Sequence, residues 1–254
     1  MRKITIALLS ALLLFATSCK KNDVKPITTV ENATLSIAFR SQIIDMPKGL
    51  EKVTDSHAED VQAGIQTVNG MTDLFEYLKV PSDAIKTNAQ IVASNARVAT
   101  AGDFVVYTWT DAQNKKIAYQ ASETADSFVF EVFLMYPNQT NWLKYFHAEE
   151  KKDKSTGSLA LIDIFGWMGD DLKAVWIFYS WRNTEDTFTF SISDKTTTDT
   201  NVFIVNKNDR SGTLSKYHDN YKESEMIWDA TGAGSWKELN RDGATTDSGT
   251  WASS

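Results

Sequence analysis

The chain has 254 residues, with 26 Lys and Arg against 33 Asp and Glu, and therefore a formal net charge of −7. An acidic chain argues against broad nucleic-acid binding, which needs clustered basic side chains, so we expect no nucleic-acid partner. A single cysteine excludes a disulfide framework and any metal site with several thiolate ligands.

The first 18 residues have the three-part layout of a signal peptide. Arg2 and Lys3 give a positive start, residues 4–15 form an apolar run, and small residues lead up to Ser18. The run is too short for a membrane-spanning helix, which needs about 20 residues. Residues 1–18 are therefore expected to be removed.

This stretch resembles the signals of bacterial lipoproteins cleaved by the lipoprotein signal peptidase, in which a small residue precedes an invariant cysteine. Ser18–Cys19 fits that pattern. The resemblance implies that Cys19 is lipidated and becomes the new N-terminus, with residues 19–30 as anchor and tether. Small residues before Cys19 also suit an ordinary signal peptidase, which would leave a free thiol.

The resemblance also implies a location. Two acyl chains give a stable membrane anchor where one binds only marginally. In such lipoproteins an aspartate directly after the cysteine often signals retention in the inner membrane, whereas here that residue is Lys20. We therefore expect a lipid-anchored protein of the outer membrane, on its periplasmic face or at the cell surface.

Residues 31–254 are expected to form one domain, whose first part, 31–100, is helical. Residues 33–46 fit both a strand and a helix, and we favour a helix. Ser56 and Glu59 have the spacing of a capping box, and Pro81 ends the following run. Apolar residues between them recur at spacings of three and four, which predicts one buried stripe: Val61, Ile65, Val68, Met71, Phe75 and Leu78.

From residue 101 the pattern changes to strands rich in β-branched and aromatic residues, separated by polar turns. The expected strands are 104–110, 116–121, 127–136, 142–148, 158–165, 173–181, 187–193, 201–205, 212–218, 224–229, 234–239 and 246–251. Such spacing is typical of an antiparallel meander. The predicted fold class is α+β, with an N-terminal helical layer packed on a long, curved, half-open barrel-like β-meander.

A weak repeat runs through the meander. Gly157, Gly212, Gly234 and Gly249 are each followed by a small hydroxyl residue and a large apolar one, and we expect them at strand starts. Residues 234–251 are typical of one hairpin turning at Asp242-Gly243. These motifs resemble uncharacterised Gram-negative outer-membrane lipoproteins with a Trp-rich C-terminal β-meander, a group with no established chemistry to carry over.

Motifs for chemistry are scarce. We expect solvated roles for His57 and His218, and none of the three histidines has a metal-ligand spacing. The adjacent carboxylates of Glu149 and Glu150 should face opposite sides of a strand. Five side chains would have to converge for a calcium site, although loop aspartates usually form turns: Asp194, Asp199, Asn206, Asn208 and Asp209. We therefore expect no cofactor, no metal site and no catalytic residues.

Most tryptophans should fill the core, but Trp167 lies in a turn between Gly166 and Gly169, where it has little to pack against. With Met168 it is the candidate binding residue. We expect a non-enzymatic module that binds an apolar ligand, a glycan or an envelope protein. An apolar cavity would favour this reading, a flat exposed patch an accessory subunit, and a histidine with a carboxylate in a cleft a hydrolase.

Overall fold

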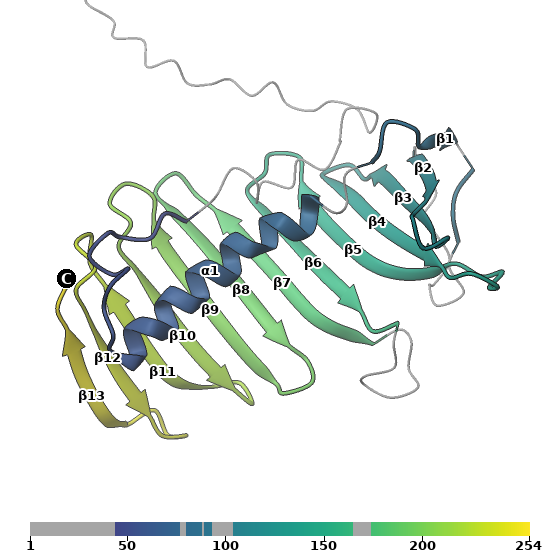
Figure 1. Ribbon diagram of the computed structural model, residues 1–254. Helices are drawn as coiled ribbons and strands as arrows, with labels where there is room; N and C mark the ends of the chain where they lie inside the picture. The colour runs from purple at the N-terminus through teal and green to yellow at the C-terminus, as the bar shows by residue number, and fades with distance from the viewer. Residues whose placement is uncertain (1–43, 77–79, 88, 93–103, 165–173) are drawn as a thin grey trace, which may run out of the picture.

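The computed structural model describes residues 44–76, 80–87, 89–92, 104–164 and 174–254, with only the backbone described for 71–76. Across these ranges one helix, α1 (Ser56–Glu76), lies against a single sheet of 13 strands (Figure 1). No helix in the described ranges has the length and apolar character needed to cross a membrane.

The sheet is an antiparallel meander in which each strand pairs with the next one along the chain, from β1 to β13. The strands are β1 (Ile85–Thr87), β2 (Phe104–Thr110), β3 (Lys116–Glu123), β4 (Ser127–Met135), β5 (Leu143–Lys151), β6 (Thr156–Ile162), β7 (Val175–Asn183), β8 (Thr187–Asp194), β9 (Asp199–Asn206), β10 (Gly212–His218), β11 (Tyr221–Trp228), β12 (Gly234–Leu239) and β13 (Thr245–Trp251). The predicted meander is confirmed, and each expected strand overlaps one of β2–β13.

The predicted α+β class is wrong. The described part of the chain contains one helix of 21 residues and no helical layer. Where 31–100 was expected to be helical, residues 44–53 form turns and Ile85–Thr87 adds β1 to the sheet. The helix expected at 33–46 lies almost wholly outside the described residues. The fold is therefore a β-meander with one helix across it.

The helix begins one residue earlier than the capping-box pattern indicated. Asp55 is the N-cap, because its Oδ1 accepts the backbone N–H groups of His57 at 2.9 Å and Ala58 at 3.3 Å. Ser56 instead lies inside the helix. The predicted stripe is confirmed for the described side chains: Val61, Ile65 and Val68 are buried.

The helix crosses one face of the curved sheet diagonally, from β12 towards β5 (Figure 1). Gly64 allows the closest approach, since a Cβ there would lie 2.0 Å from Cζ of Phe203 on β9. Asp60 pairs with Lys216 on β10 at 2.6 Å. The preceding segment is tied to the helix by Asn69, which exchanges two hydrogen bonds with the backbone of Ile44 at 3.0 and 2.9 Å.

The face under α1, here called the inner face, carries the core. Strand pairing aligns Phe190, Phe203, Leu214 and Met226 in one buried row across β8–β11. The opposite face, the outer face, carries the Thr and Ser residues that alternate with apolar residues along β8: Thr187, Thr189 and Ser191. The apolar inner face holds the main core, whereas the outer face carries a second small cluster at β3 and β4, in which Ala118 and Phe133 are buried.

Four glycines lie directly opposite tryptophans, and we call these the Gly–Trp pairs: Gly157–Trp181, Gly212–Trp228, Gly234–Trp251 and Gly249–Trp236. At each glycine an added Cβ would lie between 2.1 and 2.9 Å from an atom of the paired indole. The repeat thus lets an indole lie flat across its neighbouring strand. Gly249 lies near the end of β13, so its expected position at a strand start is wrong.

Candidate functional site

The residues singled out from the sequence cannot be placed. Trp167 and Met168 fall in 165–173 and Cys19 falls in 1–43, all outside the described residues. Three other tryptophans, Trp181, Trp228 and Trp251, are buried in the core as expected. A candidate site therefore has to be sought on the surface of the sheet and along its two ends.

A shallow groove of about 640 Å³ crosses one end of the strands, from the β9–β10 turn to the last residue of β13. Its walls combine small and apolar residues with two aspartates: Asp209, Ser211, Ile227, Trp228, Asp229, Ala230, Ala233, Gly234, Ser235 and Trp251. The two indoles are fixed, because Trp228 donates to the Arg210 carbonyl and Trp251 to the Gly232 carbonyl, each at 2.8 Å. The groove is therefore a preformed feature of the turns.

The two aspartates of the groove are held by their own turns. Asp209 Oδ1 accepts the Ser211 hydroxyl at 2.7 Å, and Asp229 Oδ1 accepts the Thr231 hydroxyl at 2.6 Å. These hydrogen bonds lower the pKa of both carboxyl groups, so both are ionised at neutral pH. Neither forms an ion pair within the described residues, and no basic side chain lines the groove.

Beside the groove, two isoleucines stand exposed on the outer face. Ile204 on β9 and Ile227 on β11 have 42% and 46% of their surface exposed. Both are paired with Thr213 on the strand between them, so the three side chains form one line, here called the isoleucine row. Ile227 also lines the groove, which makes the groove and the row one continuous surface.

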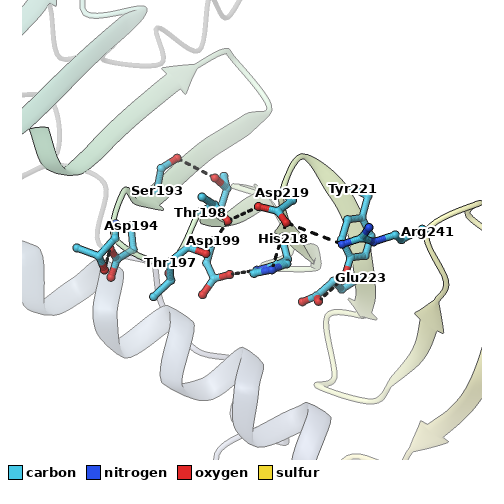
Figure 2. Close-up of polar contacts among 12 residues, drawn as sticks. Ser193, Asp194, Thr197, Thr198, Asp199, His218, Asp219, Tyr221, Glu223 and Arg241 are labelled. Carbon is cyan, nitrogen blue, oxygen red and sulfur yellow. Dashed lines mark hydrogen bonds and ion pairs between the residues drawn. The ribbon is translucent and has the colours of Figure 1, made fainter. Parts of the chain in front are cut away.

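At the opposite end of the strands, three successive turns bring polar side chains together (Figure 2). His218 Nδ1 lies 2.7 Å from Asp199 Oδ1, and its Nε2 lies 3.6 Å from Asp219 Oδ2. Asp219 also accepts the Thr198 hydroxyl at 2.6 Å. Arg241, from the β12–β13 turn, lies 5.2 Å over the Tyr221 ring. The turns β8–β9, β10–β11 and β12–β13 are thus joined by side chains.

This cluster has the residue types of a hydrolase but not the arrangement. The hydrogen bond from His218 to Asp199 raises the pKa of the imidazole, and the nearby charge of Asp219 adds to this effect. A general base would need a neutral Nε2 facing a hydroxyl nucleophile. Here Nε2 faces a second carboxylate instead. The cluster therefore works as a set of ion pairs linking turns.

One residue in the turns joined by the His218 cluster has a strained backbone. Thr198 has φ 61°, a left-handed conformation that is a clear outlier for a β-branched residue. The next turn is built from Asp219 and Asn220, with φ 47° and 67°, as in a two-residue hairpin turn of type I′. The Thr198–Asp219 hydrogen bond holds the strained turn against its neighbour.

The five side chains considered for a calcium site do not converge. Asp194 and Asp199 lie at one end of β9, whereas Asn206, Asn208 and Asp209 lie at its other end. Among the described residues, no three His, Cys, Asp or Glu side chains are placed to hold a metal ion. Glu149 and Glu150 face opposite sides of β5, as expected, with Glu149 exposed and Glu150 buried.

Two histidines behave differently from the solvated roles expected at the sequence level. His57 stacks on Trp236 with ring centroids 3.7 Å apart, and its Nε2 lies 3.2 Å from Glu238, so it fastens the start of α1 to β12. His218 is drawn into the ion pairs described above. The partners Trp236 and Glu238 of His57 and the partner Asp199 of His218 are 19 or more positions away in the sequence, so no local signal identified these contacts.

A charged group on the outer face of β4 was also missed. Glu131 accepts hydrogen bonds from Gln120 at 3.0 Å and from Lys144, and lies 3.3 Å from His147 Nδ1. A signal existed, because Glu131 is a single charge in the apolar run of residues 128–135. Such a charge needs partners on the neighbouring strands. This group lies on the sheet far from the groove.

The groove with its isoleucine row is thus the surface best shaped to meet another molecule, because it joins exposed apolar side chains to unpaired charges. The His218 cluster, in contrast, already pairs its own charges. The chain matches no protein-family model and no curated protein, so no relative lends a function to these residues.

Proposed function

We propose that this chain is an outer-membrane-anchored lipoprotein that binds a protein partner in the cell envelope without catalysing a reaction. The anchor would be Cys19, and the binding surface would be the groove with the isoleucine row. The observation that carries the proposal is the alignment of Ile204 and Ile227 beside a groove lined by two carboxylates that have no ion pair among the described residues. Exposed apolar side chains that join into one surface are a mark of interaction sites.

Buried side chains fill the inner face, and this favours a protein that binds a partner at its surface rather than a carrier of apolar ligands. A carrier needs an enclosed apolar cavity that buries most of its ligand. Here Phe190, Phe203 and Met226 are fully or almost fully buried beneath the helix, where such a ligand would otherwise lie. Both the groove and a smaller hollow of about 220 Å³ between β4, β5 and β6 open to the surface. The proposal therefore assigns binding to the outside of the sheet.

A constitutive accessory subunit is the second candidate. It would use the same isoleucine row, because a flat apolar line on a sheet face suits a permanent interface as well as a transient one. The two candidates differ in the lifetime of the complex. A binding module exchanges partners, so a fraction of it is purified without the partner, whereas an accessory subunit remains fully assembled throughout purification.

Site-specific photocrosslinking in cells of the host tests the binding surface. A photoreactive residue is placed singly at Ile204 and at Ile227, and the matched control is Ile85, an isoleucine on β1 that is 70% exposed. We expect discrete protein adducts at 204 and 227 and none at 85. Absence of adducts at both test positions, or equal adducts at 85, would contradict the proposal.

A further inference from the structure

We infer that the groove receives an extended, basic segment of the partner protein. This inference rests on the proposed function and adds the chemistry of the partner. The chemical character of the walls is the first ground for it. Asp209 and Asp229 supply two negative charges, Ser211 and Ser235 supply hydroxyl groups, and Ile227 supplies an apolar contact, while no base lines the groove.

The two carboxylates have capacity left for a cation. Each uses its Oδ1 to hold its own turn, and no hydrogen bond or ion pair within the described residues engages its Oδ2. Some acids of the sheet are paired with bases, as Glu225 is with Lys222 and Lys237, whereas the turn aspartates Asp153, Asp209 and Asp229 have no ion pair within the described residues. An ammonium or guanidinium group from outside the chain is the natural complement of a carboxylate without one.

The dimensions of the groove suit a short extended peptide. It runs across the ends of the strands from the β9–β10 turn to β13. Neighbouring strands lie about 4.8 Å apart, so the three and a half spacings of this path measure about 17 Å, the length of about five extended residues. The turns that carry Asp209 and Asp229 are two strand spacings apart, about 10 Å. Two basic residues three positions apart in a polyproline II segment, which lie on one face about 9 Å apart, would match this layout.

The negative charge of the groove and of the whole chain also distinguishes among the molecules that could bind in the groove. A second copy of this chain would bring another body with a net charge of −7, and an anionic membrane surface would be repelled in the same way. A single metal ion would need further oxygen ligands, and no such group of side chains exists in the described ranges. A free polyamine would satisfy the carboxylates but would leave Ile227 without an apolar contact. These points favour a peptide segment.

The test uses the mature, acylated protein in a neutral detergent and three soluble probes. The first is a fluorescent, end-blocked hexapeptide with the sequence Lys-Val-Thr-Lys-Val-Thr. The second is the same peptide with Glu in place of both Lys residues, and the third is spermine as an unlabelled competitor. Fluorescence anisotropy at low salt should show binding of the lysine peptide only, weakening steeply as salt is raised.

Charge removal at the groove supplies the decisive comparison. The double variant Asp209→Asn with Asp229→Asn keeps the amide Oδ1 that holds each turn, so the fold is retained while both charges are lost. We expect at least tenfold weaker binding of the lysine peptide. Asp153→Asn is the matched control, because Asp153 holds the β5–β6 turn through Ser155 in the same way, outside the groove.

Three results would overturn the inference: equal binding of the lysine and glutamate peptides, equal binding by the double variant and the parent, or full displacement by spermine at the same concentration as the peptide. Absence of binding by any probe would overturn it as well. If crosslinks still form at Ile204 and Ile227, only the basic character of the segment is wrong. If those crosslinks are also absent, the proposed function itself is wrong.

Discussion

Four glycines of the sheet have a role that becomes visible only through their cross-strand partners. In each of the Gly–Trp pairs the indole occupies the space that a Cβ would need. Packing an aromatic ring over a glycine on the adjacent strand buries apolar surface that a larger residue would displace. The sequence showed the repeated glycines, but the pairing with tryptophans 13 to 24 positions away required the strand register.

Replacing one such glycine should therefore destabilise the sheet. A Cβ on residue 212 would lie 2.5 Å from both the Ile204 carbonyl oxygen and the Trp228 ring. Gly212→Ala should lower the free energy of unfolding by about 1–3 kcal/mol, as overpacking typically does. Urea denaturation measures this, with Ser248→Ala on the exposed face of β13 as control, expected to stay within about 0.5 kcal/mol. A neutral Gly212→Ala would mean that Trp228 moves aside freely.

The contribution of the partly buried Glu131 carboxylate to folding stability depends on pH. Burial alone would raise the pKa of this carboxyl group, but hydrogen bonds from His147 and Lys144 outweigh it and bring the pKa to about 2. Because this pKa lies below that of the unfolded chain, the carboxylate stabilises the fold above about pH 4.5. That contribution, on the order of 3 kcal/mol, is lost as the pH falls from about 4.5 towards 2.

The corresponding variant is Glu131→Gln. It should be less stable than the parent at pH 7, and the difference should shrink as the pH is lowered from 4.5 towards 2, since the parent then loses the same charge. Urea denaturation at several pH values follows this difference. Glu149→Gln, which changes an exposed carboxyl on β5, should stay within about 0.5 kcal/mol of the parent at pH 7. A pH-independent difference for Glu131→Gln would contradict this role.

At the scale of elements, strands were far easier to predict than helices. β2–β13 could be predicted because β-branched and aromatic runs alternate with turn residues at short intervals. Turns such as Asp242-Gly243 carry glycine at a positive φ, here 80°. β1 was missed because three residues are too few for a period. The helix was found through its apolar stripe, but its cap was displaced by one residue, since Asp55 and Ser56 are both good N-cap residues.

The helix provides its own matched pair of substitutions. Gly64 and Gly70 both lie inside α1, but a Cβ on Gly64 would strike Phe203, whereas one on Gly70 would meet nothing within 4 Å. Gly64→Ala should destabilise by about 1–3 kcal/mol, because Phe203 is buried and cannot yield. Gly70→Ala should stabilise by about 0.5–1 kcal/mol through better helix propensity. Thermal unfolding compares them, and equal effects would mean that α1 does not lie on β9.

At the scale of the whole molecule, the sequence pattern did not show how far a helical layer extends over the sheet. In the described part of the chain a single helix crosses it, and large side chains of the inner face pack together beneath α1. The groove was equally hidden, because it is assembled from turns and strand ends between residues 209 and 251. In the sequence its two aspartates look like ordinary turn residues. They do hold their own turns, and they line the groove as well.

The proposed attachment to the membrane depends on the side chain of Cys19. Cys19→Ala removes the sulfur to which every acyl chain would be added, so the processed protein should leave the membrane fraction and become soluble. Fractionation followed by immunoblotting measures this. Cys19→Ser is the closest control in shape and should behave like Cys19→Ala. Membrane retention of both variants at the level of the parent would rule out the lipid anchor.

The most direct test of the binding function is native mass spectrometry of the protein purified from the membranes of its host. We expect the parent and Asp153→Asn to retain a protein partner, and we expect this partner to be lost when Ile204 and Ile227 are both changed to lysine. These two side chains are exposed, so the double lysine variant should keep its fold, which its thermal unfolding verifies. A folded lysine variant that retains the same partner as the parent would contradict binding through this surface.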